Sequence, residues 1–136
     1  MGIFHALNET VVNGLIGTKI GMTSFFDEAG KNVACTVIEV TPNIVTQVKT
    51  IDSDGYNALQ VGTGEKKEKN TTNPLAGHFK RAGVAPRRTV CEFRDSTLDK
   101  KEGDVITIEE VVAEGDMVAA VGRSKGKGFQ GVVKRH

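Results

Sequence analysis

The last fourteen residues, 123–136, hold the side chains best suited to chemistry: five lysines and arginines, three glycines and no acidic residue. Glycine lacks a Cβ, so the backbone at Gly126, Gly128 and Gly131 can approach another molecule closely. Lysine and arginine can then neutralise phosphates, and each neutralised phosphate releases condensed counterions. This composition predicts either an arm that binds a polyanion or a solvated basic tail without fixed structure.

Charge is distributed along the chain in blocks of opposite sign, which the formal net charge of +1 conceals. Residues 1–65 carry about −4, residues 66–94 about +6, residues 95–122 about −6 and the tail about +5. Because a polyanion is attracted to clustered cations, we expect such a partner to meet the middle block and the tail.

Residues 122–128 superficially resemble a nucleotide-binding phosphate loop, but the match fails at two positions. Three residues rather than four separate Gly122 from Gly126, and Gly128 stands where a serine or threonine would bind magnesium. The histidines and cysteines also lack the spacing of metal ligands; they are His5, His78, His136, Cys35 and Cys91. We therefore expect no catalytic site, no metal and no cofactor, and a binding protein is favoured over an enzyme.

The cysteines and the apolar pattern indicate the compartment. Cys35 and Cys91 lie in strand-like segments and predict buried, reduced thiols, which fits a cytoplasmic protein. No apolar run approaches the roughly 20 residues that span a bilayer. The first residues also lack the basic region of a signal peptide.

Short segments with strand patterns recur between residues 14 and 62 at the spacing typical of a barrel or a sandwich. Two turn signals, Asp27–Gly30 and Asp52–Gly55, separate some of them. The pattern predicts a mainly β domain. The expected strands are 15–20, 23–26, 33–40, 44–50 and 56–62.

A short basic helix is predicted over residues 74–82. Asn73 can cap its start, Pro74 suits the first helical position, and Gly83 can end it as a C-cap glycine. The helix lies within the basic middle block.

The remaining segments predict further strands. A strand is expected over residues 89–94. The tripeptide Glu-Gly-Asp occurs at 102–104 and 114–116, each time before a short apolar run. Two copies are too few for a repeat protein, so we expect a β-meander here.

Four stretches occur in an order that resembles a known family, the L-three family of the bacterial large ribosomal subunit. Four ordered motifs are far more specific than any one of them. The resemblance covers Gly14 to His136, and it places the chain in the N-terminal two-thirds of a family member. The stretches are Gly14–Thr23, Val45–Lys49 with Asp54–Tyr56, Ala76–Gly83, and Ser124–Gly131 with Lys134 and Arg135.

The resemblance implies a structural protein of the cytoplasmic ribosome, with no membrane and no small-molecule substrate. Its implied partners are the large-subunit (23S) ribosomal RNA and neighbouring large-subunit proteins. Its implied role is to support early subunit assembly near the peptidyl-transferase region. The implied fold is a translation-protein-type β-barrel with one short helix and a basic Gly/Lys extension.

Three regions follow from this resemblance. Residues 1–13 precede the family match and are expected to be a disordered extension. Residues 14–122 are expected to form the barrel, which is incomplete if strands that follow in relatives are needed to close it. Residues 123–136 are expected to begin the extension that binds ribosomal RNA. Thr18 stands where the family commonly has lysine.

The residues expected to contact ribosomal RNA are mostly basic, which predicts recognition of RNA shape through phosphate and ribose. Phe129 either stacks on a base or anchors the tail to the barrel. Two other functions stay open: a barrel module of a translation factor, and a small flavin- or nucleotide-binding barrel enzyme. The predicted contacts are Lys19, His78, Lys80, Arg81, Arg87, Arg88, Arg123, Ser124, Lys125, Gly126, Lys127, Gly128, Phe129, Gln130, Lys134, Arg135 and His136.

Overall fold

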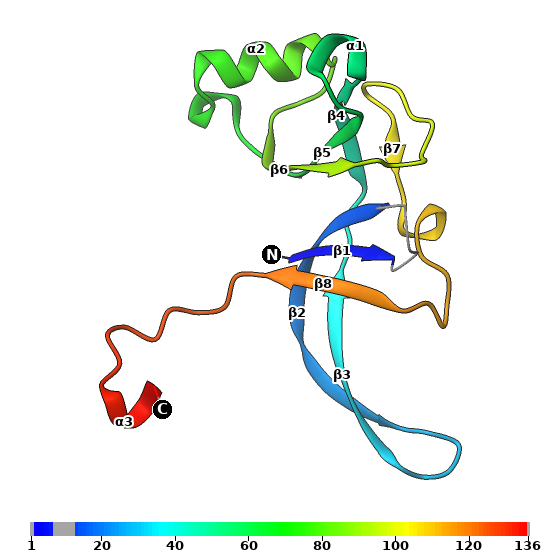
Figure 1. Ribbon diagram of the computed structural model, residues 1–136, viewed down its shortest axis with the longest axis vertical. Helices are drawn as coiled ribbons and strands as arrows, with labels where there is room; N and C mark the ends of the chain where they lie inside the picture. The colour runs from blue at the N-terminus through cyan, green and yellow to red at the C-terminus, as the bar shows by residue number, and fades with distance from the viewer. Residues whose placement is uncertain (1, 7–12, 136) are drawn as a thin grey trace.

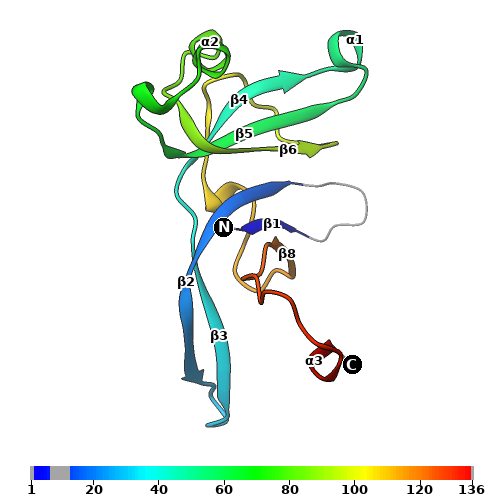
Figure 2. The same cartoon turned by 90° about the vertical axis from the view of Figure 1, so that its left-hand side faces the viewer.

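The computed structural model describes the backbone of residues 2–6 and the backbone and side chains of residues 13–135. Within these ranges the strands form two four-stranded antiparallel sheets (Figures 1 and 2). The first sheet has the order β3-β2-β1-β8, with β1 Gly2–Ala6, β2 Gly14–Phe26, β3 Asn32–Glu39 and β8 Val118–Gly122. The second has the order β6-β5-β4-β7, with β4 Asn43–Lys49, β5 Ala58–Glu65, β6 Arg87–Arg94 and β7 Val105–Ile106.

The helices are short. Two 3-10 helices, η1 Glu68–Asn70 and η2 Ile108–Glu110, accompany α1 Ile51–Asp54, α2 Asn73–Arg81 and α3 Val132–Arg135. Among the described residues, none of the helices has the length and apolar character required to cross a membrane.

Strands β2 and β3 form a long ribbon that extends away from the rest of the molecule (Figure 2). We expected two strands over 15–26, but β2 is continuous, and a β-bulge between Lys19 and Gly21 takes up the irregularity. The predicted turn over Asp27–Gly30 is confirmed: the Lys31 amide donates to Asp27 Oδ1 over 2.8 Å, and Gly30 has φ = 75°.

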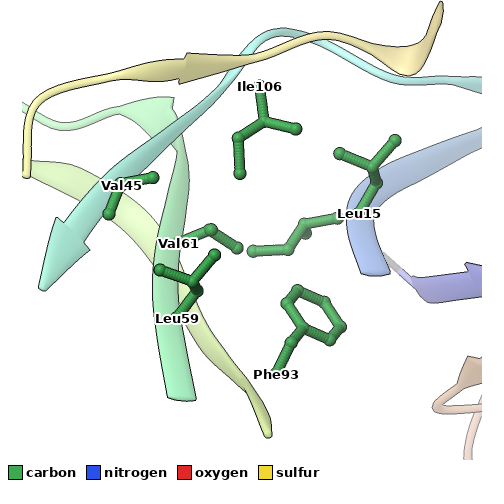
Figure 3. Close-up of a cluster of buried hydrophobic side chains, with 7 residues drawn as sticks. Leu15, Val45, Leu59, Val61, Phe93 and Ile106 are labelled. Atoms are coloured by element: carbon green, nitrogen blue, oxygen red, sulfur yellow. The ribbon is translucent and has the colours of Figure 1, made fainter. Parts of the chain in front are cut away.

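The core joins the start of β2 to the second sheet. Leu15 and Ile16 of β2 pack in one buried cluster with residues of the second sheet, which are Val45, Leu59, Val61, Phe93 and Ile106 (Figure 3). Gly14 allows this approach, since a Cβ there would clash with the ring of Phe93. The packing therefore fixes where the first sheet meets the second.

Asn43 is a fully buried polar residue that ties the two sheets together. Its Oδ1 accepts the Ile16 amide over 3.0 Å, and its Nδ2 donates to the Thr41 carbonyl over 2.9 Å. Buried polar groups are stable only when they are hydrogen-bonded, and the bond to Ile16 links β4 to β2 of the other sheet.

Three expectations differ from the structure. The β-meander over 102–121 is wrong, because β7 pairs with β4 while β8 pairs with β1 in the other sheet. Residues 1–13 were expected to be disordered, yet Gly2–Ala6 form β1 between β2 and β8; residues 1 and 7–12 lie outside the described residues. The described strands form antiparallel sheets that do not close into a barrel.

Candidate nucleic-acid interface

Helix α2 presents part of the basic middle block. Pro74 lies in its first turn, and His78, Lys80 and Arg81 lie in its last turn, where cations interact favourably with the helix dipole. The chain leaves the helix through Gly83, whose φ is 68° and whose amide donates to the Lys80 carbonyl over 3.1 Å. The predicted helix over 74–82 is therefore confirmed, shifted by one residue at each end. The predicted cap is wrong, because Asn73 is the first helical residue and Thr72 precedes it without a side-chain cap bond.

One side of α2 is buried and the other is free. Phe79 is 2% exposed and Ala82 is also buried, so these two side chains hold the helix on the domain. Lys80 and Arg81, next to Phe79 in the chain, are exposed. The packing of Phe79 thus directs two cations to the surface.

His78 lies against the second sheet rather than in the solvent. Its Nε2 is 2.7 Å from Oε1 of Gln60, which also accepts the hydroxyl of the buried Thr46 over 2.8 Å. Because an amide oxygen only accepts, Nε2 of His78 is the donor. This geometry gives His78 a packing role, and the predicted contact with RNA stays a prediction.

Gln60 continues this interaction into an ionic cluster on the same face of the sheet. Its Nε2 donates to Oε1 of Glu92 over 3.1 Å, and Lys49 Nζ lies 2.8 Å from that oxygen. Lys49 also donates to the Tyr56 hydroxyl over 2.7 Å, and Tyr56 donates to Oε2 of Glu92 over 2.9 Å. A hydrogen-bonded chain therefore runs from α2 through β5 to β4 and β6.

The cluster shifts the acidities of its two charged members. The hydrogen bond from Lys49 lowers the pKa of Glu92 below its ordinary value of 4.5. The hydrogen bond to Glu92, and then that to Tyr56, raises the pKa of Lys49. Lys49 and Glu92 are therefore charged together at neutral pH.

Arg94 adds an exposed cation to this cluster. Its Cζ lies 4.6 Å from the centre of the Tyr56 ring, and Lys49 Nζ lies 5.1 Å from it. Sequence analysis did not select Lys49, Tyr56 or Arg94. Alternation along β5 and β6 predicts which residues of each strand share a face. It does not predict that Gln60 of β5 pairs with Glu92 of β6, and this pairing assembles the cluster.

The start of β6 carries two of the predicted contacts. Arg88 is exposed, whereas Arg87 is half-buried beside Gly62. Nε of Arg87 is buried and has no hydrogen-bond partner among the described residues. The two arginines follow the connection from α2, so they continue its basic surface.

The tail extends away from the sheets after β8 (Figure 1). Its lysines and arginines are exposed, and Phe129 is 96% exposed. Phe129 therefore does not anchor the tail to the domain in this structure, which leaves its ring free to stack. Gln130 Nε2 donates to the Lys127 carbonyl, and His136 lies outside the described residues.

The predicted contacts thus fall into three separate places. Lys19 is exposed on the ribbon at the bulge of β2. Lys80, Arg81, Arg87 and Arg88 lie together at α2 and the start of β6, while the tail residues lie at the other end of the molecule (Figures 1 and 2). Such a spread suits a large ligand better than a small molecule.

The sequence is similar to ribosomal proteins of two bacteria. It is 55% identical over 124 residues to the large ribosomal subunit protein uL3 of Salinibacter ruber, covering 91% of this chain and 60% of the relative. It is 54% identical over 126 residues to the uL3 protein of Alkaliphilus metalliredigens, covering 92% of this chain and 60% of that relative. Over the aligned residues, the chain is therefore similar to uL3 proteins.

This relationship confirms the resemblance that the four ordered motifs predicted. No family model matches the chain. The chain spans about 60% of the length of the curated uL3 relatives that it matches. Sequence identity to uL3 proteins does not show which residues of this chain contact a ligand. The predicted contacts therefore stay predictions.

Proposed function

We propose that the chain is a structural, non-enzymatic component of the large subunit of the cytoplasmic ribosome, where it binds 23S ribosomal RNA beside other ribosomal proteins. The observation that carries this proposal is the 55% identity to a uL3 protein over 91% of the chain. Unrelated activities rarely share so much sequence over almost a whole chain. The name of that relative places it in the large ribosomal subunit.

The distribution of charge supports the proposal. In the sequence, the acidic block of residues 95–122 separates two groups of exposed cations. One group lies on α2 and at the start of β6, and the other lies in the tail. Phosphate contacts account for much of the affinity of proteins for nucleic acid, and a long RNA can reach several basic surfaces at once. The exposed Phe129 adds a ring for base stacking within the basic tail.

The finer description of the fold is also a proposal: the two sheets are part of a β-barrel of the translation-protein type. The ribbon supports it, because Met22, Phe25 and Phe26 are large apolar side chains that the described residues leave exposed. Strand β3 is also a free edge of its sheet. A closed barrel would cover these side chains and pair that edge.

The experiment that tests the function is sedimentation with ribosomal subunits. The tagged 136-residue chain is expressed in bacteria, and large and small subunits are separated in gradients with low and high salt. We expect the chain to sediment with the large subunit and to stay there after the high-salt wash. Its absence from the large subunit at both salt concentrations would refute the proposal.

The same experiment decides between the ribosomal function and a barrel module of a translation factor. A factor binds transiently, so high salt would release it from either subunit. Identity to uL3 favours the ribosomal function.

A further inference from the structure

A groove lies beside α2, within the basic middle block. Its volume is about 570 Å³. Glu68 of η1 borders it, α2 contributes Phe79 and Lys80, and the connection to β6 completes it. The lining residues are Glu68, Ala76, Phe79, Lys80, Gly83, Val84, Ala85 and Pro86.

Two backbone hydrogen bonds position the connection that lines the groove. The Lys66 amide donates to the Pro86 carbonyl over 3.0 Å, which fixes the connection beside the segment that precedes η1. The Val84 amide donates to the Phe79 carbonyl over 3.0 Å, which fixes the other end of the connection to α2. The connection that forms one wall of the groove is therefore held at both ends.

The lining combines apolar and charged residues. Ala76, Val84 and Pro86 offer carbon atoms, while Lys80 offers an exposed ammonium group and Glu68 a carboxylate. This combination matches a nucleotide: a flat base against carbon, a phosphate beside the lysine, and an amino group of the base toward the carboxylate.

Charge around the groove favours RNA over a peptide. Glu68 is the one acidic residue from position 66 to position 91, a stretch that contains all the lining residues and seven cations. These cations are Lys66, Lys67, Lys69, Lys80, Arg81, Arg87 and Arg88. A polyanion is attracted to all of them, whereas a basic peptide is repelled.

We propose that this groove binds one unpaired nucleobase of the ribosomal RNA, one with an exocyclic amino group, while Lys80 meets its phosphate. The proposal rests on the proposed function and names a contact within it. The Glu68 carboxylate can accept a hydrogen bond from the exocyclic amino group of adenine, cytosine or guanine, which uracil lacks. The helix then contributes a base contact in addition to its phosphate contacts.

The test fills the groove from its exposed wall. Ala85→Trp adds a large side chain at an exposed lining residue, and Ala113→Trp makes the same change at an exposed residue far from the groove in the chain. Binding of each full chain to transcribed large-subunit ribosomal RNA is measured over a range of salt. We expect Ala85→Trp to weaken binding about tenfold, since stacked bases contribute strongly to affinity. Ala113→Trp should bind like the unmodified chain.

Ultraviolet cross-linking of the unmodified chain gives a second readout that does not depend on the variant folding. We expect nucleotide adducts on the peptide that contains residues 76–86, with adenine, cytosine or guanine attached. Unchanged affinity of a folded Ala85→Trp, or adducts elsewhere in the chain and none on this peptide, would overturn the groove proposal alone. If Ala85→Trp binds the RNA normally but loses a neighbouring ribosomal protein, the groove holds a protein segment and the groove proposal is wrong. An unmodified chain that does not bind the RNA would overturn the proposed function as well.

Discussion

At the scale of single residues, the polar side chains that organise this chain are buried or half-buried and hydrogen-bonded, and the charged ones are mostly at the surface. Asn43 joins β2 to β4, and Gln60 joins α2 to Glu92. Sequence analysis found none of these roles. An asparagine in a strand pattern does not show its partner, because Ile16 and Asn43 meet only after the two sheets pack.

Replacing Asn43 with alanine should destabilise the chain by about 1–3 kcal/mol. The change leaves the buried amide of Ile16 without its acceptor, and the cost is that of an unsatisfied buried group. Urea unfolding of Asn43→Ala measures the loss. Asn32→Ala, at an exposed asparagine of β3, is the matched control and should unfold like the unmodified chain. Equal midpoints for both variants would show that Asn43 does not hold the sheets together.

Glu92 should make stability depend on pH in the acidic range. Its pKa is lowered in the folded chain by Lys49, so the folded state favours the carboxylate. This contribution is present above the ordinary pKa of 4.5 and is lost as the pH falls below 4.5 through the folded value. Unfolding of the unmodified chain and of Glu92→Gln is compared from pH 7 to pH 3. The unmodified chain should be the more stable at pH 7, and the difference should shrink on acidification; a difference that does not vary with pH contradicts the ion pair.

At the scale of elements, local signals predicted α2 and the turn over Asp27–Gly30 well, because prolines and glycines act within a few residues. The same signals failed for the segment over 102–121. Each Glu-Gly-Asp turn does precede a short strand, but a turn does not specify which sheet that strand joins. β7 and β8 pair with strands that lie far away in sequence, β4 and β1, so their separation could not be predicted locally.

The tail should bind RNA through its lysines, which meet phosphate. Replacing Lys125 and Lys127 with alanine should weaken binding about equally for different RNA sequences. It should also flatten the plot of log affinity against log salt by about 0.7–0.9 for each phosphate that is no longer neutralised. Lys31→Ala with Lys101→Ala, two exposed lysines outside the predicted contacts, is the matched control. An unchanged slope for the tail variant would mean that these two lysines do not meet phosphate.

At the scale of the whole molecule, charge and packing separate two parts of the chain. Residues 14–122 contain the core that joins the two sheets, whereas the tail buries almost no apolar side chain, with Phe129 and Val133 more than nine-tenths exposed. Blocks of charge could be predicted from the sequence, since they depend on composition alone. The mainly β class could be predicted as well, but the arrangement of the two sheets depended on packing between distant residues.

The tail is expected to gain fixed structure from RNA. Ordering each residue costs roughly 1–2 kcal/mol, and the tail buries too little surface of its own to offset this cost. The acidic block of residues 95–122 repels a polyanion, so we expect it not to contact the RNA. RNA should therefore protect some segments and leave others unchanged.

Amide hydrogen exchange of the 136-residue chain, with and without transcribed large-subunit ribosomal RNA, measures whether this RNA binds and orders the tail and α2. We expect Arg123–Arg135 and α2 to exchange more slowly when the RNA is present, the loops of the acidic block to stay unchanged, and small-subunit RNA to protect less. Slow exchange of Arg123–Arg135 without RNA, or no added protection of the tail and α2 with it, would show that RNA does not order these segments.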